Sequence, residues 1–162
     1  MTRLVPRLDA EESAAWLSLV TMLELLPRAL DSQLQRDSGM THFEFAVLSF
    51  LRFSPDQTLR MSQLATGTNA TLPRLSHVVT RLEHRGVVER VPSPDDRRAT
   101  NVRLTDDGRR ELVRAIPGHI DLVRRIVIDS LSREQLGQLT EISDAITHAL
   151  DPEGRFTALL EP

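Results

Sequence analysis

The sequence contains no cysteine, which excludes disulfide bonds, thiol-based redox sensing and metal sites built on cysteine. No run of apolar residues approaches the roughly 20 residues that a membrane-spanning helix needs. The first residues, Met1 to Pro6, lack the long apolar stretch of a signal peptide. These absences favour a cytoplasmic protein with no membrane partner, and 162 residues suit one compact domain with or without helical extensions.

The sequence motifs of common enzymes are missing as well. The chain has no nucleophile elbow, no phosphate-binding loop and no pair of carboxylates on one predicted helix face. Its histidines show no metal-ligand spacing such as i, i+4, and no acidic residue completes a set of ligands. We therefore expect no enzymatic activity, no metal and no cofactor.

Lysine is also absent, so all 20 basic residues are arginine. The net charge of −3 does not by itself suggest a nucleic-acid partner, but the charge is unevenly distributed. Residues 60–114 hold 11 Arg and 7 acidic residues, a net charge of +4, and the other residues carry −7. A basic middle on an acidic frame is typical of a local DNA-binding surface, although such asymmetry can also mark a solvated face.

Hydrophobic periodicity predicts long helices at both ends of the chain. Apolar residues recur at spacings of three and four over residues 9–37, where Pro27 should kink or divide the helix. A second helix is predicted from Thr105 to about Ser130, with a bend or interruption at Pro117, and a third over about 133–150. A helix as long and apolar as the first needs a large partner surface.

The middle of the chain predicts a helix–turn–helix followed by a β-hairpin. Thr41 begins a capping box with Glu44, and Thr71 caps a later helix that has Pro73 in its first turn. Two alternating segments flank a polar loop with adjacent arginines, which predicts the strands of the hairpin. The predicted segments are 41–51 (helix), 58–60 (strand), 61–66 (helix), 71–85 (helix), 87–91 (strand) and 100–104 (strand).

This order of elements is that of a winged helix-turn-helix, so the predicted fold class is mainly α with a small β-hairpin. The lobe would span residues 41–104. The helix after Thr71 has the diameter that enters a DNA major groove, and its outward side chains form hydrogen bonds, opposite an apolar stripe. These outward residues are Arg74, Ser76, His77, Thr80 and Arg81.

Two segments carry a resemblance to a known family. Residues 64–90 include the run Arg81-Leu82-Glu83-His84-Arg85-Gly86. They are followed, at the family's spacing, by Asp96-Arg97-Arg98 and then Val102-Arg103-Leu104-Thr105, a D-x-R wing followed by V-x-L-T. Over about 45 residues the sequence resembles the MarR family of bacterial regulators.

The resemblance implies a homodimeric transcription regulator, more often a repressor, that binds a pseudo-palindromic site on double-stranded DNA. Residues 9–37 and 105–150 would form the helical dimerisation region. Many members also bind a small aromatic or phenolic effector that releases the DNA. The residues at the major groove would be Arg74, Ser76, His77 and Thr80, with Thr71, Pro73 and Arg81 as further DNA-binding residues of this helix. In the wing, Arg97 and Arg98 would bind DNA, with Arg98 in the minor groove and Asp96 bracing the hairpin.

Several interpretations stay open at this point. Arg81 and Arg85 either contact phosphates or form salt bridges with Asp96 or Glu89. Aromatic residues usually pack in cores, yet a few could line an effector pocket, and the candidates are Trp16, His42 and Phe45. A winged helix can also serve as a protein–protein module, but such an interface should carry aromatic anchors in place of polar side chains and arginines.

The chain departs from the family pattern at the start of the recognition helix. There Thr71-Leu72-Pro73-Arg74 replaces the usual small polar residues, which predicts an individual base preference. The family's peroxide-sensing branch relies on a cysteine near the N-terminus, and the absence of cysteine excludes that mechanism here.

Overall fold

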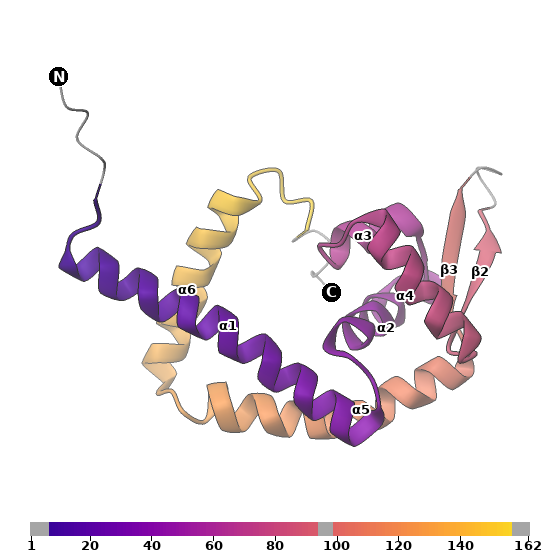
Figure 1. Cartoon of the computed structure of the whole chain (residues 1–162), viewed down its shortest axis with the longest axis horizontal. Coiled ribbons are helices and arrows are strands. Elements are labelled where there is room, and N and C mark those ends of the chain that lie inside the picture. The colour runs from indigo at the N-terminus through magenta and orange to yellow at the C-terminus, as the bar shows by residue number, and fades with distance from the viewer. Residues whose placement is uncertain (1–6, 94–98, 157–162) are drawn as a thin grey trace.

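A computed structural model describes residues 7–93 and 99–156 of the chain (Figure 1). The mainly helical class with a small sheet is confirmed. The elements are α1 (Ala10–Ser38), α2 (His42–Phe53), the 3-10 turn η1 (Pro55–Gln57), β1 (Thr58–Arg60), α3 (Met61–Gly67), α4 (Leu72–His84), β2 (Val88–Pro92), β3 (Thr100–Leu104), α5 (Asp106–Val123), the π-helical turn η2 (Arg124–Ile128) and α6 (Arg133–Leu150).

The helices begin at the capping residues that the sequence predicts. At the start of α2, Thr41 Oγ1 accepts a hydrogen bond from the Glu44 backbone N–H at 3.0 Å, and Glu44 Oε2 accepts one from the Thr41 N–H at 2.8 Å. Ser132 and Gln135 form the equivalent capping box at α6. Each box satisfies backbone donors that a helix start leaves unpaired, so the sequence fixes where these helices begin.

Neither internal proline divides its helix. α1 is continuous through Pro27, and α5 runs through Pro117 to Val123 before it passes into η2. A proline inside a helix removes one backbone hydrogen bond. The two helices pack along each other (Figure 1). The predicted division at Pro27 and interruption at Pro117 are therefore wrong, and the alternatives, a kink at Pro27 and a bend at Pro117, stay predictions.

The hairpin is part of a three-stranded antiparallel sheet in the order β1-β3-β2. Leu59 of β1 lies opposite Val102 of β3, and Arg90 of β2 lies opposite the same Val102 on the other side. Because β3 is central, β1 ties the hairpin to the body of the lobe.

One hydrophobic core joins α2, α3, α4, the sheet and the first half of α5. Its fully buried side chains pack from helices and strands that are distant in sequence, so the lobe is a single packed unit. The largest of them are Leu34, Met40, Leu48, Leu51, Leu64, Leu75, Leu82, Leu112, Val47, Val79, Val88 and Val102.

The junction between α4 and α5 is tightly built. Gly86 follows α4 with a φ of 73°, a left-handed conformation that glycine adopts without strain. Thr105 Oγ1 donates to the Gly86 carbonyl at 2.7 Å, and Gly108 packs so closely that an added Cβ would lie 2.0 Å from the Val87 carbonyl oxygen. This contact fixes α5 against the end of α4.

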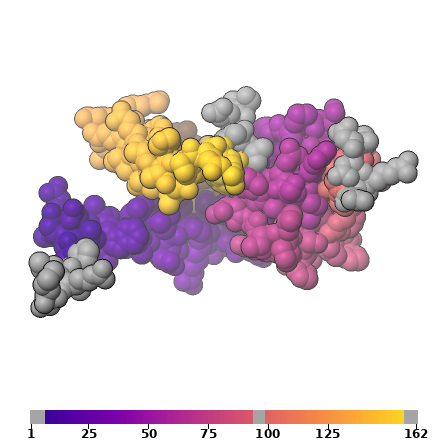
Figure 2. All heavy atoms as spheres, turned by 90° about the horizontal axis from the view of Figure 1, so that it is seen from above, coloured from indigo at the N-terminus to yellow at the C-terminus, as the bar shows by residue number. Residues whose placement is uncertain are grey.

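In contrast, the first half of α1 and the whole of α6 lie largely outside the core. In the part of the chain that the structure describes, α6 has no buried residue, and α1 buries only Gln33 and Leu34. α6 crosses α1 in Figure 1 and lies in a different layer of the molecule when it is seen from above (Figure 2). The segment that follows α6 reaches the α3–α4 turn, where Asp151, Arg155 and Phe156 line a pocket. Among the described residues, no helix is both long and apolar enough to cross a membrane.

Candidate nucleic-acid interface

The helix α4 has one apolar face and one polar face. Thr71 caps its start by accepting a hydrogen bond from the Arg74 backbone N–H at 3.4 Å, and Pro73 occupies the first turn, where no backbone donor is needed. The inner face packs into the core through Leu75, Val78, Val79 and Leu82. The opposite face is therefore free to meet a partner.

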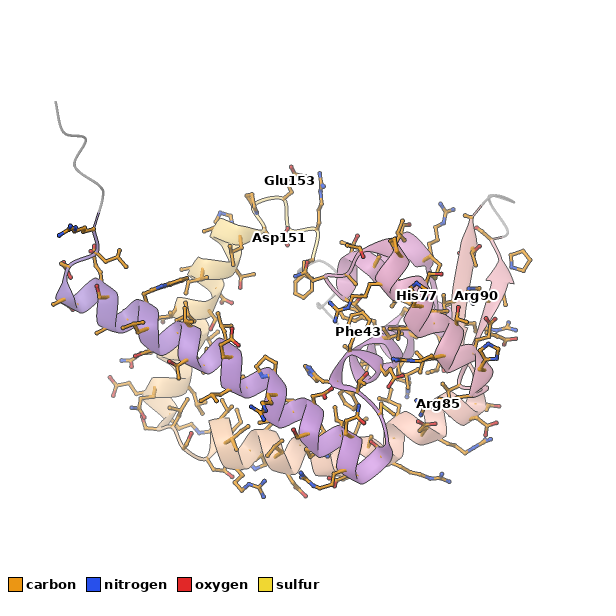
Figure 3. The ribbon with its side chains drawn as sticks, in the orientation of Figure 1. Phe43, His77, Arg85, Arg90, Asp151 and Glu153 are labelled. Atoms are coloured by element: carbon orange, nitrogen blue, oxygen red, sulfur yellow. The ribbon has the colours of Figure 1, made fainter. Side chains whose placement is uncertain are left out.

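The structure places the predicted reading residues on this outer face. All but one are exposed, and Ser76 is half-buried. His77 lies near the middle of the helix, between the first turn of α2 and the hairpin (Figure 3). The exposed members of the set are Thr71, Pro73, Arg74, His77, Thr80 and Arg81.

Arg90 of β2 attaches the hairpin to α4 (Figure 3). Its guanidinium donates to the Ser76 carbonyl oxygen at 3.1 Å and to Thr80 Oγ1 at 3.0 Å, and it forms an ion pair with Glu83. Its backbone N–H also donates to Glu83 Oε1 at 3.1 Å. Arg90 thus sets the position of the hairpin relative to α4.

The contacts of Arg90 have two consequences for neighbouring side chains. The Arg90 backbone N–H and guanidinium hold the pKa of the Glu83 carboxyl below its usual range. The Thr80 hydroxyl accepts from Arg90 and donates to the Ser76 carbonyl at 2.9 Å. Thr80 is exposed at the predicted face, but its hydroxyl already serves a bond within the protein.

The sequence did not single out Arg90 as a brace. The trace of this contact in the sequence is only the spacing of Glu83 and Arg90, an arginine seven residues after an acidic residue, in the first strand of the hairpin. That spacing has no meaning until the turn at Gly86 folds the strand back along α4.

Arg81 and Arg85 form ion pairs, but not with the predicted partner Glu89. Arg81 lies 3.1 Å from Glu44 Oε1, and Arg85 lies 3.7 Å from the same oxygen and also pairs with Glu111. Glu89 pairs instead with Arg103 across the hairpin at 2.9 Å. Glu89 is therefore not the partner, because the acidic partners come from α2 and α5, whose packing on α4 is not local in sequence. Asp96, the other predicted partner, lies outside the described residues, and a phosphate contact of Arg81 or Arg85 stays a prediction.

Arg74 makes a different contact with α2. The centre of its guanidinium lies 4.5 Å from the centroid of the Phe43 ring, in cation–π geometry. Phe43 is half-buried and packs against the core, so the ring is a fixed platform.

Asp96, Arg97 and Arg98 lie outside the residues that the structure describes. The base of their loop is described: the Ser93 backbone N–H donates to the Ala99 carbonyl at 3.3 Å, beyond the last paired residues of β2 and β3. The loop therefore starts and ends on two paired strands that Arg90 attaches to α4.

The three effector candidates do not form one group within a chain. His42 and Phe45 both contact His119 of α5, with ring centroids 6.1 Å and 4.5 Å apart. Trp16 is exposed. It lies fifteen residues before Asp31, which accepts a hydrogen bond from the His42 backbone N–H, and fifteen residues of helix span about 22 Å along α1. A cavity of about 570 Å³ lies elsewhere, between the α3–α4 turn and residues 151–156.

Burial shapes the chemistry of the histidine pair. Burial lowers the pKa of His42, although the charge of Asp31 acts in the opposite direction. Burial also lowers the pKa of His119, and the charge of His42 lowers it further. Over residues 7–93 and 99–156, no three histidine, aspartate or glutamate side chains converge as metal ligands do. The described residues present hydrogen-bonding side chains and guanidinium groups on the exposed face of α4, beside a hairpin. This geometry suits binding in a DNA groove.

Comparison with known proteins gives matches in sequence. A family model described as the MarR family matches residues 38–99. The chain is 30% identical over 129 residues to the HTH-type transcriptional regulator PecS of Dickeya dadantii (strain 3937). The matched residues cover 75% of this chain and 74% of that protein. Three further curated regulators are matched over only 53–54% of their own length.

Solved structures give matches over nearly the whole chain. Sco3205, a MarR family transcriptional regulator from Streptomyces coelicolor crystallised in complex with DNA, is 42% identical with a TM-score of 0.87, over 93% of this chain and 94% of that one. AbsC, a MarR family transcriptional regulator from the same organism, is 33% identical with a TM-score of 0.86, over 91% and 99%.

Proposed function

This chain belongs to the MarR family of DNA-binding transcriptional regulators, and we propose that it acts as a homodimeric repressor on a pseudo-palindromic operator. The observation that carries the proposal is the polar, exposed face of α4 with a hairpin attached beside it through Arg90. Such a unit fits a major groove with its helix and an adjacent minor groove with its hairpin. The place of action is the cytoplasm, where a regulator of this kind meets the chromosome.

Apolar surface on α1 and α6 supports the proposed dimer. In the single chain, Trp16, Leu17 and Leu25 of α1 are 54%, 63% and 62% exposed, and Ile142 of α6 is 59% exposed. Surfaces of this kind are rarely left in water, and a second copy of the same chain covers both helices symmetrically. Residues 9–37 and 105–150 form the dimerisation region in this proposal, and 41–104 the DNA-binding lobe.

The reading residues divide between the two grooves. Arg74, Ser76 and His77 lie in the first half of α4, the end that usually meets base edges in helix-turn-helix proteins. Arg98 enters the narrow, electronegative minor groove from the hairpin loop, with Arg97 beside it and Asp96 bracing the loop.

A small aromatic or phenolic effector releases the DNA in this proposal. His42 and Phe45 lie where the DNA-binding lobe meets α5, so a ligand that contacts them changes how the lobe sits on the dimerisation region. A panel of phenolic compounds tests this by thermal shift. The ligand-induced rise in Tm should disappear in Phe45→Ala, and a rise that persists unchanged places the effector elsewhere.

DNA binding is tested by selecting bound sequences from random double-stranded DNA and titrating salt in a gel shift. A regulator that neutralises phosphates loses affinity steeply as salt rises, and the selected site should contain two inverted half-sites. Light scattering at micromolar concentration should give twice the chain mass of 18.3 kDa. A monomeric mass, or binding that is insensitive to salt, contradicts the proposal.

A further inference from the structure

Three arginines form one edge of α4, the edge that faces α2. Arg74, Arg81 and Arg85 are spaced by seven and four residues, which places them on one side of a helix. All three are contacted by the first turn of α2, through Phe43 or Glu44. We call this set the arginine edge; Figure 3 labels its last member, Arg85, and the platform residue Phe43.

Glu44 forms ion pairs with two of these arginines, Arg81 and Arg85. Its carboxylate is only 4% exposed; one oxygen caps α2 and the other pairs with Arg81 and Arg85. Arg85 also pairs with Glu111 of α5. These two guanidiniums face a buried charge that must stay paired, so their donors serve the packing of α4 on α2.

Arg74 differs from the other two members of the arginine edge. Within residues 7–93 and 99–156, its side chain has no carboxylate partner and no hydrogen bond, and its guanidinium carbon lies over the Phe43 ring. A guanidinium that is stacked by its face keeps the N–H groups along its edge for a planar pair of acceptors. Phe43 itself is held by the core and by the capping box at the start of α2.

We propose that Phe43 is a positioning residue that stacks Arg74 in the orientation in which it binds a pair of acceptors on DNA, while Arg81 and Arg85 fix α4. The acceptor pair is either O6 and N7 of a guanine or two oxygens of a phosphate. The proposal rests on DNA reading by α4. The stack works because it restricts a long side chain before binding, so less conformational entropy is lost when the contact forms.

Four variants test the stack in the full-length protein. Phe43→Leu removes the ring and keeps an apolar side chain, and Phe50→Leu makes the same change at another half-buried phenylalanine of α2 with no cation on it. Arg74→Ala removes the reading group, and Arg74→Lys keeps the charge but loses the planar face. Each variant is checked for folding by thermal melting and then passed through selection on random DNA and a salt-titrated gel shift.

We expect Phe43→Leu to reproduce the effect of Arg74→Ala, about a 3- to 10-fold loss of affinity for the selected site, and the double variant to bind no more weakly than Arg74→Ala. If the acceptors are on guanine, both variants relax the same base position. If they are phosphate oxygens, affinity falls equally on all sequences and the salt slope of Arg74→Ala drops by about one.

The proposal is overturned if Phe43→Leu keeps the base preference and affinity of Phe50→Leu. If Phe43→Leu fails to fold, Arg74→Lys tests the proposal by itself. Wild-type affinity and base preference in this variant would show that the charge, and not the planar guanidinium, makes the contact. Failure of the proposed function has a separate signature, because in that case the wild-type protein selects no DNA sequence.

Discussion

The side chain of Arg90 lies between the hairpin and α4, where it contacts Ser76, Thr80 and Glu83. The sheet alone does not fix the angle at which the hairpin leaves the lobe, because antiparallel strands twist and bend easily. An arginine with several acceptors on the neighbouring helix restricts that angle. Arg90 therefore helps to set the direction in which the hairpin leaves the lobe.

Replacing Arg90 with Met should lower the free energy of unfolding by about 1–3 kcal/mol, because the charged hydrogen bonds of a mostly buried guanidinium are lost while its apolar stem is kept. Urea unfolding measures this change. The matched control is Arg103→Met on the next strand. Its ion pair with Glu89 is about half exposed, so a loss of no more than about 1 kcal/mol is expected. Equal losses in the two variants would show that Arg90 is an ordinary surface pair.

Arg98→Ala should weaken operator binding by about 1–3 kcal/mol and leave the protein folded, because in the proposed function Arg98 contacts the minor groove, and such an arginine contributes affinity and no core packing. Fluorescence anisotropy with the selected operator gives the affinity. Arg110→Ala removes the same charge from an exposed position on α5, where Asp107 is its partner, and should change affinity little. If Arg98→Ala binds the operator with the affinity of the wild type, the assignment of the hairpin to the minor groove is wrong.

At the scale of elements, helix starts were predictable because capping is local. Thr41, Thr71 and Ser132 each reach a backbone donor two to three residues ahead, and the sequence contains all the atoms involved. Interactions between elements were not predictable in the same way. Glu44 was identified as a capping residue, yet its second role, pairing with Arg81 of α4, depends on how two helices pack. Pro27 was also expected to kink or divide its helix, and α1 is not divided there.

The junction of α4 and α5 gives a prediction for these elements. Gly108→Ala should lower the free energy of unfolding by about 1–3 kcal/mol, because its Cβ would lie 2.0 Å from the Val87 carbonyl oxygen and α5 must shift. Thermal or urea unfolding measures the loss.

Gly137→Ala is the control for this substitution. Gly137 is also inside a helix, α6, but nothing lies within 4 Å of its added Cβ. The higher helix propensity of alanine should stabilise this variant by up to about 1 kcal/mol. A Gly108→Ala variant as stable as Gly137→Ala would show that α5 is not held against α4.

For the molecule as a whole, the sequence identified the family, the winged helix-turn-helix and the absence of enzymatic function, and relatives that are transcriptional regulators confirm all three. The motif succeeds because strand, loop and helix follow each other at fixed spacing. Trp16 shows where this reasoning stops. Its apolar neighbours indicate burial, but among the described residues it is 54% exposed, and in the proposed function a second copy of the chain covers it.

The contact between the DNA-binding lobe and α5 makes the stability of the whole molecule depend on pH. Burial lowers the pKa of His42 and His119 in the folded chain below the usual value of 6.5. The unfolded chain then binds protons more readily than the folded one, so the free energy of unfolding is at its full value above about pH 6.5 and falls as the pH decreases below it.

Urea unfolding at pH 7.5 and 5.5 tests this dependence. His119→Gln removes one titrating ring from the pair, so its stability should fall less between the two pH values than that of the wild type. His148→Gln, at an exposed position of α6, is the control and should keep the wild-type dependence. If His119→Gln loses as much stability as the control, carboxylates elsewhere account for the acid sensitivity. If its loss is smaller, protonation of the His42–His119 pair weakens the contact between the lobe and α5.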